Sequence, residues 1–518
     1  MNTTPTHFPA SQRTNYQFPV YRWIGWLAVA GFAIGLTLMF FISGMFGVPA
    51  PLAWAFLVIL FTFGALLLDR PKLLLNCMLF YFLLMPENRL FGIIWLPLPG
   101  FIDDLFFMPL LAVIVMNWIQ RRQLKEATLF PLIFILIAMV SWYVNGKPSP
   151  STTARVIQTV LRPYILWYYC RLTCTFKDEK ELNRWFWIFL GYATVQFFYN
   201  VLWQGGRPWV LYIPDASGGV FGPDGNKAHL VGYFSIIALF VGWGWWITYG
   251  QTQRRKVRQM VLICLVIIAY NLVVMTDTKH ALVMMPVAFL PFLLHPSYSV
   301  KARLLSVGFI VLLGVASLLL FASGRFGGSE GLYYYRQMAI NSPKGDMYKA
   351  VTTEFHYLVP YPLLGAGAGR FGSFQSIDKR TPLARRYYIP YDDEFRRLKL
   401  VKGDTNQTAR GSTLRSPFSW ITMIVSEFGW LGGGVYFLFL FWVAYKLWRK
   451  STLFPRHSLV GGVALGLSAS LLLLFLISFL FIALGVPLLY VFIWMFIGRL
   501  WDMEKPEEGP ALVKAALK

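Results

Sequence analysis

The sequence predicts an all-α polytopic membrane protein with about fourteen transmembrane helices and one large extracytoplasmic loop. Composition is the first reason: 57% of the 518 residues are hydrophobic and only 14% are charged, whereas soluble domains are about 45–50% apolar and about 25% charged. The second reason is that apolar residues come in blocks, many of them near the roughly 20 residues that cross a bilayer. The third is that one long polar segment, Ser323 to Arg415, interrupts the series.

The apolar blocks define the expected spans in order. They lie near residues 24–45, 50–68, 72–86, 104–120, 127–145, 154–171, 184–203, 229–249, 258–276, 280–296, 302–322, 418–447, 459–483 and 485–502. The third, fourth and tenth are short, so re-entrant segments also fit them. The expected organisation is a cytoplasmic N-terminal segment (1–22), transmembrane helices 1–11 (23–322), the large loop (323–416), transmembrane helices 12–14 (417–502) and a cytoplasmic tail (503–518).

Basic side chains predict the orientation, because short cytoplasmic loops carry an excess of Lys and Arg. In this chain they gather in alternate short loops: Arg70 and Lys72; Arg121, Arg122 and Lys125; Arg171, Lys177, Lys180 and Arg184; Arg254, Arg255, Lys256 and Arg258; Lys301 and Arg303; Lys446, Arg449, Lys450 and Arg456. We therefore expect both termini in the cytoplasm and the long loop outside.

The formal net charge of +23 does not predict nucleic-acid binding, because the basic residues lie in short membrane loops and not in a soluble tract interleaved with aromatic rings. The four cysteines lie in or beside apolar runs, without the further ligands of a zinc site. No clustered carboxylates predict a Mg²⁺ site. We expect no cofactor and no metal.

Arg162 is the clearest ionisable residue inside an apolar run, and such residues are costly and usually functional. Arg155 precedes it by about two helical turns, so both guanidinium groups should share one helix face, and Pro163 should kink that helix. Arg162 either opens an anion site outward or pairs structurally with a buried carboxylate such as Asp103 or Asp104.

A tight turn, Thr276 to Ala281, carries Lys279 and His280 between two long apolar stretches. Lys279 either binds an anion or anchors the chain at the interface by extending its ammonium group to water. His280 reads most simply as an interfacial histidine.

The long loop holds fifteen Lys or Arg against eight Asp or Glu. This basic excess fits a face that binds an anionic glycolipid, and a generally solvated surface is the alternative. Within the loop, glycines alternate from Gly365 to Gly369. Such a run allows backbone N–H groups to converge on an anion, or it forms a tight turn. The strand and βαβ context of a nucleotide fingerprint is missing.

After the loop, Ser416 and Pro417 predict the N-cap and first turn of a helix. Glu427 lies ten residues further on, where an ion pair with a neighbouring arginine is its simplest role.

These features together resemble the O-antigen ligase and polymerase superfamily, which includes exopolysaccharide polymerases. Thr276 to Ala281 is similar to the family's T-G-S-R-G-A turn, with Lys279 in place of Arg. Pro362 to Gly369 is similar to its P-L-L-G-x-G-x-G. The segment from Ser419 to Leu431 is similar to its closing helix, whose E-x-G-x-x-G corresponds to Glu427, Gly429 and Gly432. The resemblance covers about residues 220 to 450, and the remainder only by hydropathy.

One departure concerns the position about nine residues before the glutamate. Many family members carry His-Asn there, whereas this chain has Phe418 and Ser419. The ligase branch of the family depends on that histidine, so its absence favours a polymerase-like relative.

The resemblance implies a GT-C-like glycosyltransferase in the bacterial cytoplasmic membrane. It would polymerise polyprenyl-diphosphate-linked oligosaccharides on the outer face of the membrane, with the growing glycan as acceptor and with flippase and chain-length regulator proteins as partners. Cations would hold the leaving diphosphate, and we name Arg162, Lys279, Arg370 and Arg415 for this role, with Arg325 and Arg336 as second choices. Arg415 also belongs to the catalytic set, in which Glu427, His356 and His280 are the candidate general bases.

Three alternatives to a polymerase remain open. The first is a ligase that moves finished glycan to a lipid or other acceptor. The second is a lipid-glycan flippase or transporter, which would place charge along a central path through many spans. The third is a non-catalytic subunit of an envelope assembly complex, in which the charged outer residues would tolerate substitution.

Overall fold

The computed structural model describes residues 70–84, 89–90, 94–95, 106–107, 109–111, 113–115, 129–147, 149–203, 218–221, 228–276, 278–296, 298–322, 359–373, 419–479 and 487–503. The chain forms two compact units, Met1–Cys77 and Met78–Lys518. The boundary between them falls inside α3 (Pro71–Leu84). All later elements belong to the second unit, which contains the site.

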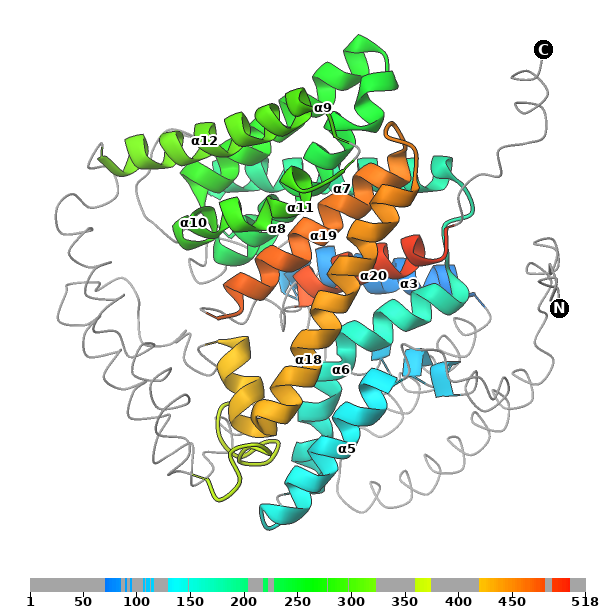
Figure 1. Ribbon diagram of the computed structural model, residues 1–518, viewed down its shortest axis with the longest axis vertical. Coiled ribbons are helices and arrows are strands. Elements are labelled where there is room, and N and C mark those ends of the chain that lie inside the picture. The colour runs from blue at the N-terminus through cyan, green and yellow to red at the C-terminus, as the bar shows by residue number, and fades with distance from the viewer. Residues whose placement is uncertain are drawn as a thin grey trace. The chain divides into compact units, whose positions relative to one another are not determined.

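The described part of the second unit is built mainly from helices (Figure 1). They are α5 (Leu129–Val144), α6 (Pro150–Thr173), α7 (Glu179–Trp203), α8 (Ala228–Ile247), α9 (Arg255–Tyr270), α10 (Lys279–Ala288), α11 (Leu290–Leu293), α12 (Val300–Ala322), α18 (Trp420–Leu453), α19 (Leu459–Ile477) and α20 (Pro487–Trp501). Two short 3₁₀ helices, η4 (Gly219–Phe221) and η6 (Tyr249–Thr252), and one π-helix, η7 (Asn271–Met275), accompany them. Strands β1 (Arg89–Leu90) and β2 (Ile94–Trp95) form an antiparallel pair.

These helices coincide with the apolar runs, because a chain in a bilayer must satisfy its backbone polar groups internally. Four are long and apolar enough to cross a membrane: Leu230–Ile247, Arg255–Met275, Trp420–Leu453 and Leu459–Ile477. Together with shorter apolar helices such as α5 and α20, they indicate a helical membrane protein. The count of fourteen spans and the extent of the large loop stay predictions.

One local expectation needs correction. Helix α18 is capped by Ser419, not by Ser416, because the Ser419 hydroxyl accepts the N–H of Thr422 at 3.0 Å from an extended backbone. Helix α6 runs from Pro150 to Thr173 with Pro163 buried in its middle, and a kink at Pro163 stays a prediction.

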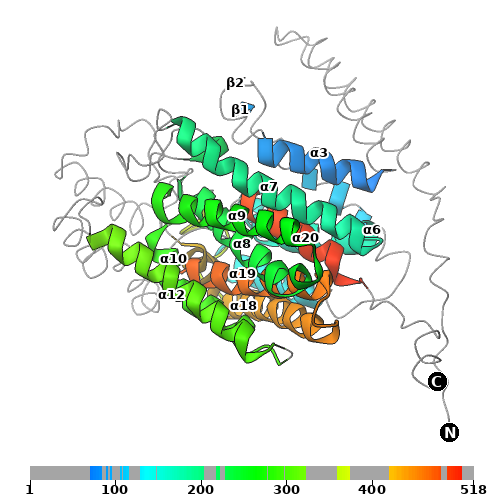
Figure 2. The same ribbon diagram turned by 90° about the horizontal axis from the view of Figure 1, so that it is seen from above.

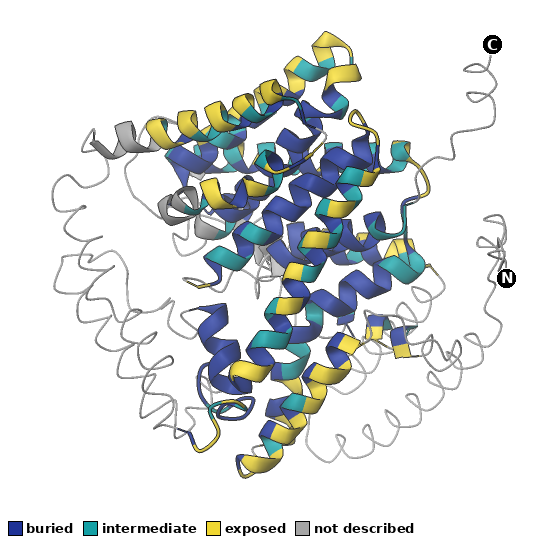
Figure 3. Ribbon diagram, in the orientation of Figure 1, coloured by how far each residue is buried: buried dark blue, intermediate teal, exposed yellow. Residues whose placement is uncertain are grey.

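Helices α8 and α19 form the core of the unit and lie side by side in both views (Figures 1 and 2). Glycines allow their backbones to meet: a side chain at Gly244 would collide with the carbonyl of Gly462, and one at Gly466 would collide with Val241 and Phe240. Small residues permit this close approach between membrane helices. The pairing runs antiparallel, since later residues of α8 meet earlier residues of α19. Figure 3 shows α19 buried along most of its length.

Contacts between loops gather the basic segments at one end of these helices. His457, before α19, meets the carbonyl of Thr248 after α8 at 3.3 Å. Ser458 donates to Glu179 at the start of α7. Arg499 of α20 donates to the carbonyl of Cys174 after α6 and pairs with Glu181 at 2.6 Å. We call this the cationic end; its described Lys and Arg residues are Arg171, Lys177, Lys180, Arg184, Arg254, Arg255, Lys256, Arg258, Lys301, Arg303, Lys446, Arg449, Lys450, Arg456 and Arg499.

Candidate functional site

Residues 359–373, the glycine-rich loop, dock on a break in α18 at the end opposite the cationic end (Figure 1). The break is at Gly429, whose φ of 70° and ψ of −175° are not helical. This backbone region is open essentially only to glycine. A side chain at Gly429 would also collide with the carbonyl of Leu363. The same end holds the C-terminus of α19, since Ile421 N–H donates to the Ser478 carbonyl at 3.2 Å.

The break in α18 supplies the backbone groups that the loop uses. In an unbroken helix, Leu431 N–H would bond the Glu427 carbonyl four residues earlier. Here Leu431 N–H donates to Leu363 O at 3.1 Å, while the Glu427 carbonyl accepts from Gly367 N–H at 3.1 Å. Ala366 N–H donates in the same way to Ser426 O at 2.8 Å. Loop and helix thus satisfy each other's polar groups, which a buried loop requires.

The Glu427 carboxylate holds the second half of the loop. One oxygen, Oε2, accepts Gly369 N–H at 2.7 Å. The other, Oε1, accepts the N–H groups of Phe371 (3.2 Å), Gly372 (3.1 Å) and Ser373 (2.8 Å). N–H groups therefore do converge on an anion here, but only Gly369 belongs to the run of alternating glycines, and the anion is a carboxylate of the same chain.

This geometry bears on the expected roles of Glu427. The residue is fully buried, and its described partners are backbone N–H groups and the Ser373 side chain, where an arginine was expected. A carboxylate engaged by four N–H groups and closed off from solvent is poorly placed to take a proton from a substrate hydroxyl. The arrangement favours a positioning role, and Glu427 as a general base stays a prediction.

Helices α5 and α6 frame the other side of the loop. Asn145, just after α5, donates through Nδ2 to the Gly365 carbonyl at 3.0 Å. Thr153, in the first turn of α6, donates to the Ala368 carbonyl at 3.3 Å. Gly369, at a φ of 83°, has no room for a side chain beside Thr152. The half-buried Arg370 donates through its guanidinium to the carbonyl of Asn145.

Three cations belong to the segments that meet here: Arg370 in the loop, Lys147 two residues after Asn145, and Arg155 two residues after Thr153. Lys147 and Arg155 are exposed. Arg162 lies nine residues beyond Thr153 on α6, about 14 Å further along the helix axis, and its guanidinium sits 5.2 Å from the centre of the Phe107 ring. Of the two α6 arginines, Arg155 is therefore closer to the loop along the helix axis.

The turn at Thr276 is at this same end, beside the start of α8. Thr276 and Thr278 are buried, and their hydroxyls lie 3.1 Å apart. Thr278 packs on Gly232, where a side chain would not fit. The preceding π-helix carries Asn271, which accepts from Asn200 at 2.7 Å. π-Helices often mark functional sites, and this one fixes the turn with a buried polar network.

The structure places the remaining expected residues only in part. Lys279 and His280 open α10, and their side chains are outside what the structure describes. Also outside the described residues are Arg325, Arg336, His356, Arg415, Asp103 and Asp104. Whether these residues join Arg370 stays a prediction.

Sequence reasoning missed the residues that frame the loop, namely Asn145, Lys147, Thr152 and Thr153. The available signal was weak: the polar run from Asn145 to Thr153 between two apolar blocks. This pattern is typical of a turn between two helices. The sequence does not show that the segment contacts a loop more than 200 residues later.

Comparison with known proteins adds no family: no protein-family model matches the chain, and no curated protein matches it. Fold and site together define a helical membrane protein whose glycine-rich loop is docked, with cations around it, at one end of the helices.

Proposed function

We propose that the protein is a glycosyltransferase that polymerises polyprenyl-diphosphate-linked oligosaccharide repeat units on the outer face of a bacterial cytoplasmic membrane. The observation that carries the proposal is the contact between Pro362–Gly369 and Glu427–Gly432. Both segments resemble motifs of the O-antigen ligase and polymerase superfamily, and they fit together through hydrogen bonds and through Gly429. Two separate resemblances that meet in one structural unit support the proposal more than either does alone.

The position of the loop supports the outer face. The basic loops gather at the cationic end and the glycine-rich loop lies at the other. If Lys and Arg mark the cytoplasmic side, the loop faces outward. A lipid-linked donor would then reach it from the outer leaflet.

The reaction would join the oxygen of an acceptor hydroxyl to the anomeric carbon of the donor sugar. The bond from that carbon to the diphosphate oxygen breaks, and the lipid diphosphate leaves with the electron pair. Arg370, with Arg155 and Lys147, would stabilise the charge that develops on the diphosphate, and fixed cations of this kind lower such barriers by several kcal/mol. The proton of the hydroxyl passes to a base that we leave unassigned.

The test uses purified protein in detergent with a polyprenyl-diphosphate-linked repeat unit, followed by gel analysis of glycan length. A ladder of repeat units is the expected product, and Arg370→Ala should lower its rate by at least about tenfold, because a charge-assisted contact to phosphate contributes about 1.5–3 kcal/mol. The control is Arg449→Ala at the cationic end, which should leave the ladder unchanged.

A different outcome of this assay would indicate one of the alternative functions. Transfer of preformed chains to a lipid acceptor without a ladder would identify a ligase. Movement of labelled donor across vesicles without a new glycosidic bond would identify a transporter. Unchanged activity in Arg370→Ala would remove the loop from the site.

A further inference from the structure

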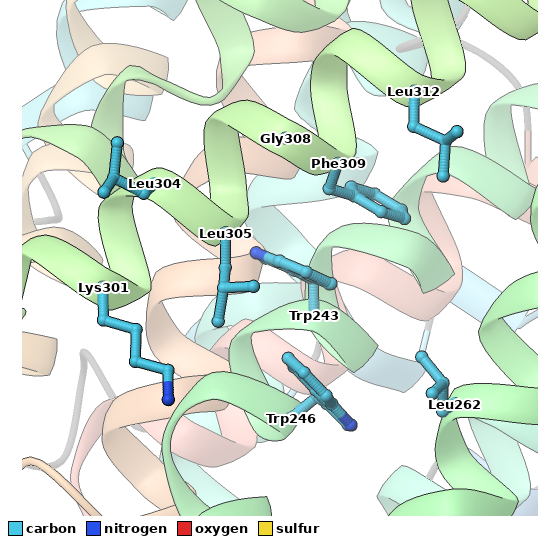
Figure 4. A pocket seen from close by; sticks show the side chains of 9 residues that line it. All are labelled: Trp243, Trp246, Leu262, Lys301, Leu304, Leu305, Gly308, Phe309 and Leu312. Carbon is cyan, nitrogen blue, oxygen red and sulfur yellow. The ribbon is translucent and has the colours of Figure 1, made fainter.

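A groove of about 590 Å³ lies between α8, α9 and α12, within the size range of ligand sites. Apart from one lysine, its lining is apolar: Trp243, Trp246, Leu262, Lys301, Leu304, Leu305, Gly308, Phe309 and Leu312 (Figure 4). The α12 residues recur every three or four positions, so they form one helix face. Much of this face is exposed (Figure 3), with Leu304 64% and Leu312 65% accessible.

The floor of the groove is rigid. Trp243 stacks on Phe309 at 4.4 Å between ring centres and on Trp246 at 5.2 Å. The Trp243 indole N–H donates to the Ser306 hydroxyl at 3.0 Å, and this hydrogen bond fixes the orientation of the ring. Gly308 leaves a notch in the wall, since nothing lies within 4 Å of where its side chain would be.

Charge is confined to one end of the groove. Figure 4 shows Lys301 at one end and Leu312 at the other. Arg258 covers Trp246 beside the groove, with its guanidinium 4.8 Å from the ring centre. Both cations belong to the cationic end. From Lys301 to Leu312 the helix rises about 16 Å, close to the thickness of one leaflet of a hydrocarbon core of about 30 Å.

We infer that this groove binds one anionic phospholipid of the bilayer. Its acyl chain lies along α12 from Leu304 to Leu312, and its phosphate lies between Lys301 and Arg258. Two basic side chains at one end of an apolar groove one leaflet deep match a lipid with a negative headgroup and hydrocarbon tails. The groove is at the end of the helices away from the glycine-rich loop, so this inference does not depend on the proposed function.

The test is native mass spectrometry of the purified full chain titrated with phosphatidylglycerol, or with phosphatidylcholine of the same acyl chains. We expect one phosphatidylglycerol bound at least about fivefold more tightly than phosphatidylcholine. Lys301→Glu should weaken phosphatidylglycerol at least about fivefold. Gly308→Leu fills the notch and should abolish binding of both lipids. The matched control is Gly314→Leu on the same helix, also with open space around it, which should bind as the unaltered protein does.

Three results would overturn the inference: equal affinity for the two lipids, equal binding by Gly308→Leu and Gly314→Leu, or displacement of phosphatidylglycerol from the groove by a polyprenyl phosphate. Should Gly308→Leu fail to fold, Lys301→Glu decides, because the Lys301 side chain is exposed and its replacement leaves the packing intact.

Discussion

At the scale of the residue, Glu427 is the most informative side chain. A buried carboxylate is costly unless its charge is met by hydrogen bonds. Here the N–H groups of Gly369 and of residues 371–373 meet it, and these positions come from a loop more than fifty residues earlier. Its charge therefore joins two distant parts of the chain.

Replacing Glu427 by Gln tests this role. Glutamine has the same shape but no charge, and its amide would place a donor against backbone donors. We expect the amides of Gly369, Phe371, Gly372 and Ser373 to exchange with deuterium at least about tenfold faster, because hydrogen bonds to a charged group contribute about 1.5–3 kcal/mol.

The control is Ser426→Ala. The Ser426 hydroxyl donates to Met423 O within its own helix, so exchange in the loop should stay as in the unaltered protein. Unchanged loop exchange in Glu427→Gln, accompanied by lost activity, would instead assign Glu427 to proton transfer.

At the scale of the element, the break in α18 explains how a single apolar run can hold a site. Hydropathy predicts one helix across 418–447, and the structure has one from Trp420 to Leu453. The non-helical Gly429 inside it exposes two carbonyls and one N–H for the loop to use. The helix is thus long and apolar enough to cross a membrane and also presents a docking surface.

Gly429→Ala should undo this docking. Its backbone conformation costs a residue with a side chain about 1–3 kcal/mol, and the collision with Leu363 O adds to that. We expect a lower melting temperature in detergent and faster proteolysis within the glycine-rich loop.

Gly434→Ala is the matched control on the same helix. Nothing lies within 4 Å of its added side chain, so this variant should be neutral or more stable by up to about 1 kcal/mol. Equal behaviour of the two variants would show that the break does not hold the loop.

Particular elements show how far the sequence carries the fold. Apolar run length predicted α5 to α9, α12 and α18 to α20, because a bilayer imposes that length on any helix that crosses it. The single run expected at 280–296 instead forms two short helices, α10 and α11. The glycine run marked the place where N–H groups gather, although three of the four donors follow the run. The sequence did not predict that the bound anion is the Glu427 carboxylate, nor that Asn145 and Thr153 contact the loop. Hydrophobic periodicity carries no information on which distant segments meet. The predicted N-cap, Ser416, lies three residues before the observed one, Ser419. Residue type alone therefore did not fix where the helix begins.

At the scale of the whole molecule, the separation of the cationic end from the glycine-rich loop predicts orientation. Tyr361 is exposed in the loop, and Thr252 is exposed beside the start of α9. In spheroplasts, a membrane-impermeant maleimide should label Tyr361→Cys directly and Thr252→Cys only after permeabilisation.

The unaltered chain is the blank for this labelling, since Cys170 and Cys174 are buried and Cys77 and Cys264 are half-buried. The reverse labelling pattern would turn the loop to the cytoplasm and remove the proposed access from the outer leaflet.

The central claim is that residues 359–373 receive the diphosphate of a lipid carrier. Hydrogen–deuterium exchange of the peptide covering this loop tests it most directly, with purified protein and either a polyprenyl diphosphate or the uncharged polyprenol of the same length. The account predicts protection of the loop by the diphosphate alone, and its loss in Arg370→Ala. Equal protection by the two lipids, or none by either, would contradict it.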